Sequence, residues 1–192
     1  MNIAPDYPQL SDEELFELVK QHDDAAFRVL YKRYDKRLFA YCTKVAAGER
    51  KVAEDLFQMT MTAVYEKRES FLGGSFVAWL FTIARNFSIK VTQRANYQRN
   101  TMVSLDDFSE TIADVNDRTD GDIFMKEALK KAIASLSHDY REALELRYYE
   151  GFSYEQISDT LSITVSLAKV RVFRAKQQLQ QILSPYLKEY QS

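Results

Sequence analysis

The sequence predicts an all-α fold made of two small helical domains joined by an acidic, flexible linker. The 192-residue chain contains only five Gly and three Pro, too few for the tight turns that connect strands of a sheet. Apolar residues recur at spacings of three and four over long stretches rich in good helix formers. Two capping boxes, Ser11–Glu14 and Ser153–Gln156, mark helix starts. Because 46% of the residues are hydrophobic, the chain can also form packed cores.

The first domain, residues 1–100, is expected to contain four helices, over about 12–22, 24–47, 50–68 and 75–99. The second helix has an apolar stripe, with Cys42 beside it, that consists of Phe27, Leu30, Tyr31, Tyr34, Leu38, Tyr41 and Val45. The third helix should turn inward Val52, Leu56, Met59 and Ala63. Its other face should present Asp55, Gln58 and Thr62. The fourth should be capped by Ser75 and bury Phe76, Leu80, Ile83, Phe87 and Val91.

The second domain, residues 124–192, is expected to contain helices over 124–134, 138–149, 154–161 and 165–183. The last of these should end before Pro185, because proline cannot continue the backbone hydrogen bonds of a helix. Its inward positions are Val165, Ala168, Val172, Ala175, Leu179 and Ile182. At 100° per residue its outward positions are Ser166, Val170, Phe173, Arg174 and Gln177, flanked by Lys169 and Arg171.

Residues 101–123 are predicted to be the linker. Residues 101–124 hold seven acidic side chains and one basic one, whereas the flanking parts of the chain each have a net charge of +2. A segment that is acidic and poor in apolar residues does not form a core. It is either a mobile tether or an acidic peptide that imitates nucleic acid, and the sequence favours neither.

Composition excludes several classes of protein and site. A single cysteine, Cys42, allows no internal disulfide, and the first ten residues lack the features of a signal peptide, so we expect a cytoplasmic location. The longest apolar stretch, residues 76–84, is far shorter than the roughly 20 residues that cross a bilayer, so no membrane insertion is expected. Two histidines and one cysteine do not form a zinc site. No phosphate loop or nucleophile motif is present, so the sequence predicts no cofactor, no catalytic residue and no enzyme.

The helices over 154–161 and 165–183, joined by a short turn, have the pattern of a helix-turn-helix. The outward face of the second helix is basic and also contains Val170 and Phe173, which suit contacts with thymine methyl groups in the major groove. The alternative is a solvated basic face on which a neighbour covers Phe173.

A second candidate DNA-binding region is the loop 71–75 with the helix that follows it. Residues 70–104 contain four basic side chains and no acidic one. Aromatic rings beside cations suit single-stranded DNA, because bases stack on the rings while phosphates pair with Lys and Arg. The alternative is that Phe76, Trp79 and Phe81 are ordinary core residues.

Four strings make the interpretation specific: AEDLFQMTMTAVYEKRESF, FVAWLFTIARN, LRYYEGFSYEQISDTLSI and KVRVFRAKQQL. In order and spacing they closely resemble the extracytoplasmic-function (ECF) group of bacterial sigma factors, from about Asp24 to Leu183. The resemblance implies a non-catalytic subunit that binds core RNA polymerase, directs it to promoters and helps to open the DNA. It also implies that the linker threads toward the polymerase cleft, and that an anti-sigma protein is a frequent partner.

The resemblance also implies roles for single residues. Asp55 and Gln58 would dock on a coiled coil of the largest polymerase subunit, with Met59 where the family usually has an acidic residue. The minus-ten element would be contacted by Phe71, Asn86, Lys90 and Arg94. The minus-thirty-five element would be contacted by Lys169, Val170, Phe173 and Arg174, with Arg147 and Tyr154 at backbone phosphates. Departures from the family pattern occur at Ser158, Ser162 and Ser166-Leu167-Ala168, and Leu167 is the position most expected to alter the promoter sequence.

Two other functions remain to be weighed. One is a stand-alone helix-turn-helix regulator, and the other is a helical protein-interaction adaptor. Autonomous DNA binding favours a clearly basic domain, whereas residues 125–192 have a net charge of only +2. An adaptor would not need basic residues gathered on two separate faces. A sigma factor held on DNA by polymerase explains both features.

Overall fold

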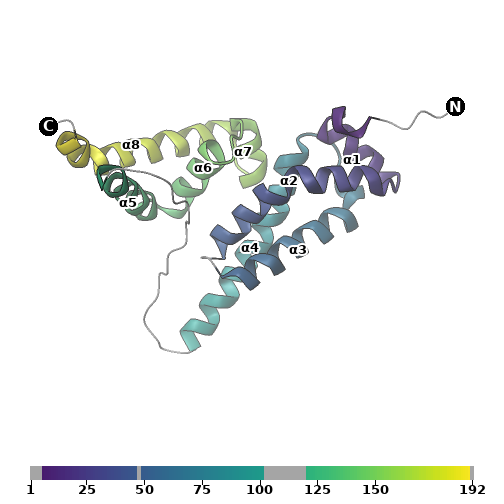
Figure 1. Cartoon of the computed structure of the whole chain (residues 1–192), viewed down its shortest axis with the longest axis horizontal. Coiled ribbons are helices and arrows are strands. Elements are labelled where there is room, and N and C mark those ends of the chain that lie inside the picture. The colour runs from purple at the N-terminus through teal and green to yellow at the C-terminus, as the bar shows by residue number, and fades with distance from the viewer. Residues whose placement is uncertain (1–5, 47–48, 102–119, 191–192) are drawn as a thin grey trace. The chain divides into compact units, whose positions relative to one another are not determined.

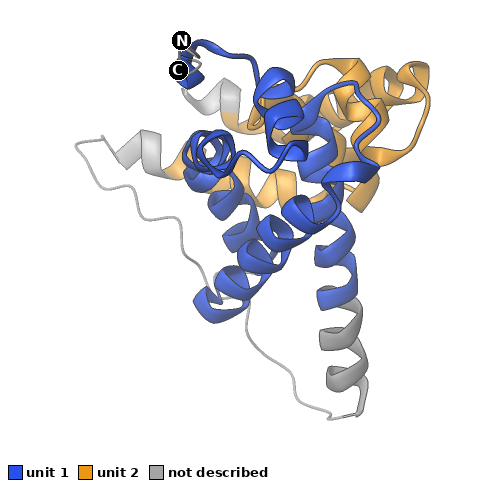
Figure 2. Cartoon of the chain, turned by 90° about the vertical axis from the view of Figure 1, so that its right-hand side faces the viewer, with its two compact units in different colours: residues 1–112 blue, residues 113–192 orange. Residues whose placement is uncertain are grey.

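In the computed structural model the chain divides into two compact units, residues 1–112 and 113–192 (Figures 1 and 2). The structure describes residues 6–46, 49–101 and 120–190, with side chains over 6–46, 49–91 and 124–186. Every regular element within these residues is a helix, in agreement with the predicted all-α class. None of the helices within these residues has the length and apolar character needed to cross a membrane.

The first unit contains η1 (Tyr7–Gln9), α1 (Asp12–Lys20), α2 (Asp24–Val45), α3 (Arg50–Glu66), η2 (Arg68–Ser70) and α4 (Phe76–Thr101) (Figure 1). Helices α1 and α3 pack on α2, and α4 packs on α3 and contacts α1 and α2. The predicted stripe of α2 forms core at Leu30, Tyr34 and Leu38, and Cys42 is fully buried among these residues. Tyr31 lies outside this core, on the exposed side of the helix.

One inward position of α3 was predicted wrongly. Met59 is 44% exposed, and Thr60 is buried in its place. After Leu56 the helical period allows either the third or the fourth residue to face the core, and the buried set here continues through Thr60 to Ala63 and Val64. The Thr60 hydroxyl tolerates burial because it donates a hydrogen bond to the Leu56 carbonyl at 2.7 Å.

The second unit contains α5 (Asp120–Ser135), α6 (His138–Tyr148), α7 (Tyr154–Leu161) and α8 (Val165–Tyr190) (Figure 1). Helices α5, α6 and α7 all pack against α8, whose Ala168, Val172 and Ala175 are buried as predicted. Residues 120–123 belong to α5 although we predicted them as linker; residues 102–119 of that linker lie outside the described residues.

The end of α8 differs from the prediction. The helix continues through Pro185 to Tyr190. Beyond the proline, the Tyr186 ring lies 5.7 Å from that of Phe124 on α5, so tertiary packing offsets the helix hydrogen bond that Pro185 cannot donate. Ile182, predicted to face inward, is 39% exposed near this end.

Helix ends follow the predicted chemistry. Both capping boxes are formed: the hydroxyls of Ser11 and Ser153 accept from the amides of Glu14 and Gln156, whose side chains accept from the serine amides in return. Ser75 also caps α4, since its hydroxyl accepts from the Ala78 amide at 3.4 Å.

Candidate functional site

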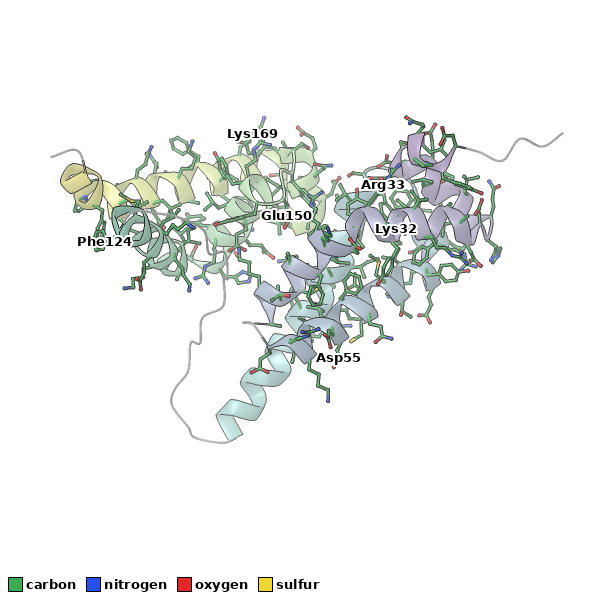
Figure 3. All side chains as sticks on the ribbon, viewed as in Figure 1. Lys32, Arg33, Asp55, Phe124, Glu150 and Lys169 are labelled. Atoms are coloured by element: carbon green, nitrogen blue, oxygen red, sulfur yellow. The ribbon has the colours of Figure 1, made fainter. Side chains whose placement is uncertain are left out.

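The outer face of α3 presents the first group of predicted site residues. The side chains of Asp55, labelled in Figure 3, and of Gln58 are exposed, as is that of Met59, the next residue in the sequence. Within the described residues the Asp55 carboxylate has no ion-pair partner, whereas the neighbouring Glu54 is paired with Arg50 at 2.8 Å. An exposed, unpaired carboxylate beside an amide and a thioether forms a small polar and apolar surface that suits contact with another protein.

A groove of about 850 Å³ adjoins this face, between α2 and α3. Gln58 lines the groove together with aromatic residues, including Tyr31 and Phe57, whose rings meet edge to face at 5.6 Å. Thus the partial exposure of Tyr31 places an aromatic side chain next to the predicted docking residues.

In the loop between η2 and α4, Phe71 is buried. Its ring is only 3% exposed and packs against Phe16, Phe76 and Trp79. A base stacks only on an open ring face, and this ring has none in the free chain, so its contact with the minus-ten element stays a prediction. The core reading of Phe76, Trp79 and Phe81 is confirmed for Phe76 and Phe81, which are fully buried, while Trp79 is partly buried.

Leu72 takes the exposed place in this loop. Its side chain is 95% exposed, and the next two residues, Gly73 and Gly74, have φ of 107° and 89°. Positive φ at both positions explains the Gly-Gly pair, since other residues rarely adopt this backbone. We did not predict Leu72, although a large apolar residue directly before a Gly-Gly pair was a usable signal.

Two of the predicted minus-ten residues share one exposed face of α4. Asn86 and Lys90 lie one turn apart, and the Lys90 ammonium group stands 5.8 Å from the centre of the Phe87 ring. The Asn86 amide can both donate and accept hydrogen bonds. Arg94 belongs to α4, but its side chain lies outside the described residues.

The structure brings four predicted residues together on α8. Lys169, Val170, Phe173 and Arg174 are all exposed, and the apolar side chains of Val170 and Phe173 are 51% and 58% exposed (Figure 3 labels Lys169). The alternative in which a neighbour covers Phe173 is therefore wrong for the described residues. Arg171, which flanks this face, forms an ion pair with Asp139 on α6 at 2.5 Å.

Arg147 and Tyr154 support the start of this face from the side. The Arg147 guanidinium donates to the Phe152 carbonyl at 2.6 Å and lies 4.8 Å from the centre of the Tyr154 ring. Lys169 approaches the same ring at 5.7 Å. The pKa of nearby Glu155 is lowered, first by a hydrogen bond from its own amide and then by the Ser153 hydroxyl and the charges of Lys169 and Arg147. These contacts connect α6, α7 and α8 at the end that carries the predicted DNA-binding residues.

The turn before α8 is also well defined. Ser162 adopts the left-handed conformation, with φ 53° and ψ 48°, a backbone that favours glycine. The Ser158 hydroxyl donates to the Ile163 carbonyl at 2.5 Å, across the turn. Thr164 then caps α8, as its hydroxyl accepts from the Leu167 amide at 3.2 Å. Leu167 itself is 40% exposed, so this departure from the family pattern lies on the surface.

Comparison with known proteins places each unit in a family. The family model "Sigma-70 region 2" matches residues 30–96, and the model "Sigma-70, region 4" matches residues 126–179. The chain is 29% identical over 189 residues to the ECF RNA polymerase sigma-E factor of Haemophilus influenzae, an alignment that covers 93% of this chain and 98% of that protein. The chain belongs to the ECF group of sigma factors. The sigma-E factor of Escherichia coli K12 is similar at 27% identity over 190 residues, covering 94% and 98% of the two chains.

Two solved structures resemble this sigma factor. The sigma factor RpoE of Bartonella quintana, solved in complex with the anti-sigma factor NepR, matches with a TM-score of 0.65 and 28% identity, over 82% of this chain and 96% of that one. CnrH, solved with the cytosolic domain of CnrY, shares the fold, with a TM-score of 0.65 and 21% identity over 91% and 97%. Matches in both units do not fit a stand-alone helix-turn-helix regulator or an adaptor. The protein is a sigma factor, which binds core RNA polymerase and promoter DNA.

Proposed function

We propose that this sigma factor divides promoter recognition between its two units. The α3 face of Asp55 and Gln58 binds core polymerase. The loop 71–75 and the α4 face of Asn86 and Lys90 bind the melted minus-ten element, and the α8 face binds the minus-thirty-five element as duplex. Sigma factors of this family act as initiation factors, and we propose that this chain acts in the cytoplasm without catalysing a reaction.

The observation that supports this division best is the exposure of Val170 and Phe173 between Lys169 and Arg174. Two apolar side chains on a solvated helix face are unfavourable in water. In the major groove they can contact thymine methyl groups, while Arg174 can donate two hydrogen bonds to a guanine. The net charge of −2 makes tight binding by the free chain unfavourable, which fits a protein that reads DNA only when polymerase holds it there.

Sequencing the transcripts made from genomic DNA by core polymerase with this protein would define the promoter. On that promoter Arg174→Ala should lower the affinity by roughly 1–3 kcal/mol if the contact is bidentate to a base. Lys130→Ala is the control, because it removes an exposed positive charge from α5, in the same unit but outside the predicted α8 face. Equal losses in the two variants, or unchanged promoter choice after replacing Val170, Phe173 and Arg174 together, would refute the assigned face.

Core docking has a separate test. Asp55→Ala combined with Gln58→Ala should weaken binding to core polymerase while leaving the helical circular-dichroism signal unchanged, since both side chains are exposed. Glu17→Ala is the control, because it removes an exposed carboxylate from α1, where it pairs with Lys20 at 2.7 Å. A double variant that binds core as tightly as the wild type would contradict the docking assignment.

We also propose that an anti-sigma protein covers the α3 face when the factor is inactive. The Bartonella relative is seen in complex with such a protein, and the aromatic groove beside Gln58 offers an apolar surface for a partner helix. The prediction is competition: core polymerase should displace the regulator. Simultaneous binding of both would argue against a shared surface.

A further inference from the structure

The segment before residue 30 lies outside the matched Sigma-70 region 2, yet it contacts both ends of the loop 71–75. Helix α1 packs against α2, α4 and η2. Asp12 of α1 connects this helix to α2. Asp12 pairs with Arg33 at 2.6 Å and accepts a short hydrogen bond from the Tyr34 hydroxyl. Arg33, labelled in Figure 3, also donates to the carbonyls of Pro8 and Leu10 at 2.9 and 2.8 Å.

Helix α1 fixes the beginning of the loop through Phe71. The Phe71 ring meets the fully buried Phe16 ring edge to face at 5.3 Å. The Lys20 ammonium group lies 5.3 Å from the centre of the Phe71 ring. Two residues of α1, one turn apart, therefore hold the ring in place.

The same helix fixes the end of the loop through Glu13. Its Oε1 accepts a hydrogen bond from the Phe76 amide, the first of α4, at 2.9 Å. The first amides of a helix have no partner within the helix, and a carboxylate there also interacts favourably with the helix dipole. Ser75 satisfies a different amide, that of Ala78, so Glu13 adds a second cap from 63 residues away in the sequence.

Between these two anchors the loop is open. Leu72 is almost fully exposed, and a Cβ atom added to Gly73 or Gly74 would meet nothing within 4 Å. Because the ends of the loop are fixed and its centre is exposed, Leu72 and the backbone of the two glycines can approach an extruded base. In other DNA-binding proteins, apolar side chains insert between stacked bases and separate them.

We infer that Glu13 is a positioning residue for promoter melting. By capping α4, it holds the loop 71–75 in one conformation. This inference rests on the proposed role of the loop at the minus-ten element. Glu13 does not touch DNA itself. Its effect is to keep the loop in the conformation that binds, so its loss lowers the binding-competent fraction and with it the apparent affinity.

The test compares Glu13→Ala with Asp23→Ala. Asp23 caps α2 through the amides of Ala25 and Ala26 and also accepts a hydrogen bond from the Tyr7 hydroxyl, so its loss removes the cap of a different helix of the same unit. Holoenzyme made with each variant is titrated with a fluorescent single-stranded oligonucleotide that carries the non-template minus-ten sequence of the mapped promoter. Affinity for core polymerase is measured in parallel, together with amide hydrogen exchange of Phe76 in the free protein.

Glu13→Ala should weaken oligonucleotide binding by about two- to tenfold, the range expected from losing one cap. Exchange at the Phe76 amide should become faster, with core affinity unchanged. Asp23→Ala should bind the oligonucleotide like the wild type. Glu13→Gln retains an acceptor oxygen and should lie between wild type and Glu13→Ala, which keeps the test valid if the alanine variant folds poorly.

Three results overturn the inference, and the last is distinguishable from the first two. If the wild-type holoenzyme binds the oligonucleotide and both Glu13 variants bind it equally well despite faster exchange at Phe76, the cap is purely structural. An equal loss in Asp23→Ala leads to the same conclusion. If the wild-type holoenzyme does not bind the oligonucleotide, the proposed role of the loop fails, and the inference fails with it.

Discussion

Phe16→Leu should selectively destabilise the first unit. Phe16 is fully buried, and its ring contacts Phe71 at 5.3 Å, Phe76 at 4.7 Å and Trp79 at 5.2 Å. Each aromatic pair contributes about 0.5–1.5 kcal/mol beyond the burial of area, and the smaller leucine also leaves a cavity. Leucine still fills most of the site, so we expect the free energy of unfolding to fall by about 2 kcal/mol.

The sole tryptophan of the chain makes the assay specific. Trp79 belongs to this aromatic cluster, so its fluorescence during urea denaturation reports on the first unit. With a urea slope of about 1–3 kcal/mol/M, the midpoint should fall by about 1 M. Phe152→Leu makes the same change at a fully buried ring of the second unit and should leave the Trp79 transition in place. An unchanged midpoint in Phe16→Leu, or an equal fall in Phe152→Leu, would refute this reasoning.

Three further outcomes are expected. Ser158→Ala removes the hydrogen bond to Ile163 and should lower the free energy of unfolding by about 1 kcal/mol, measured as a lower thermal midpoint by circular dichroism. Adding Ser162→Gly should recover part of this stability, because glycine adopts the left-handed conformation without strain. No recovery would contradict backbone strain at Ser162. The hydrogen bond from the Tyr7 hydroxyl, followed by backbone amides, lowers the pKa of Asp23 below its ordinary 3.8. The ionised Asp23 therefore stabilises the fold fully above pH 3.8, and this stabilisation is lost as the pH falls through the lowered pKa of the folded state. Asp23→Asn should flatten the acid side of a plot of urea midpoint against pH. An acid side that is unchanged in this variant would contradict the role of Asp23. Burial raises the pKa of the Cys42 thiol to about 12, so a thiol reagent at pH 8 should label Cys42 only in urea, and rapid labelling of the folded protein would show that the site opens.

The local chemistry of the fold could be predicted well from the sequence. The capping boxes at Ser11 and Ser153 and the start of α7 depend on residues within one helical turn, and they occur as predicted. Errors arose where packing between distant segments decides the outcome. Helix α8 passes Pro185 because Tyr186 finds a partner on α5, and no local pattern contains that contact.

The candidate site shows the same distinction. The α8 face depends only on helical period, so the exposure of Val170, Phe173 and Arg174 could be predicted. The loop 71–75 could not be, because the burial of Phe71 depends on Phe16, 55 positions away, and that burial leaves Leu72 as the exposed residue. Glu13 was missed for the same reason: as a sequence feature it is one of several acids in the first turn of α1.

Each of the two proposed DNA-binding faces offers few charged side chains, which limits how the proposed mechanism can operate. The α8 face offers two cations and two apolar side chains, and the described part of the α4 face offers Asn86 and Lys90. Few phosphate contacts give low affinity at physiological salt. Two weak sites on one chain gain affinity when both can bind together, because the second event becomes intramolecular. That gain depends on how the two units are held, and in the proposed mechanism core polymerase holds them. Core polymerase must therefore provide the spacing as well as the catalysis, so lengthening the promoter spacer by half a helical turn should abolish transcription while leaving the affinity of the free protein for either element unchanged.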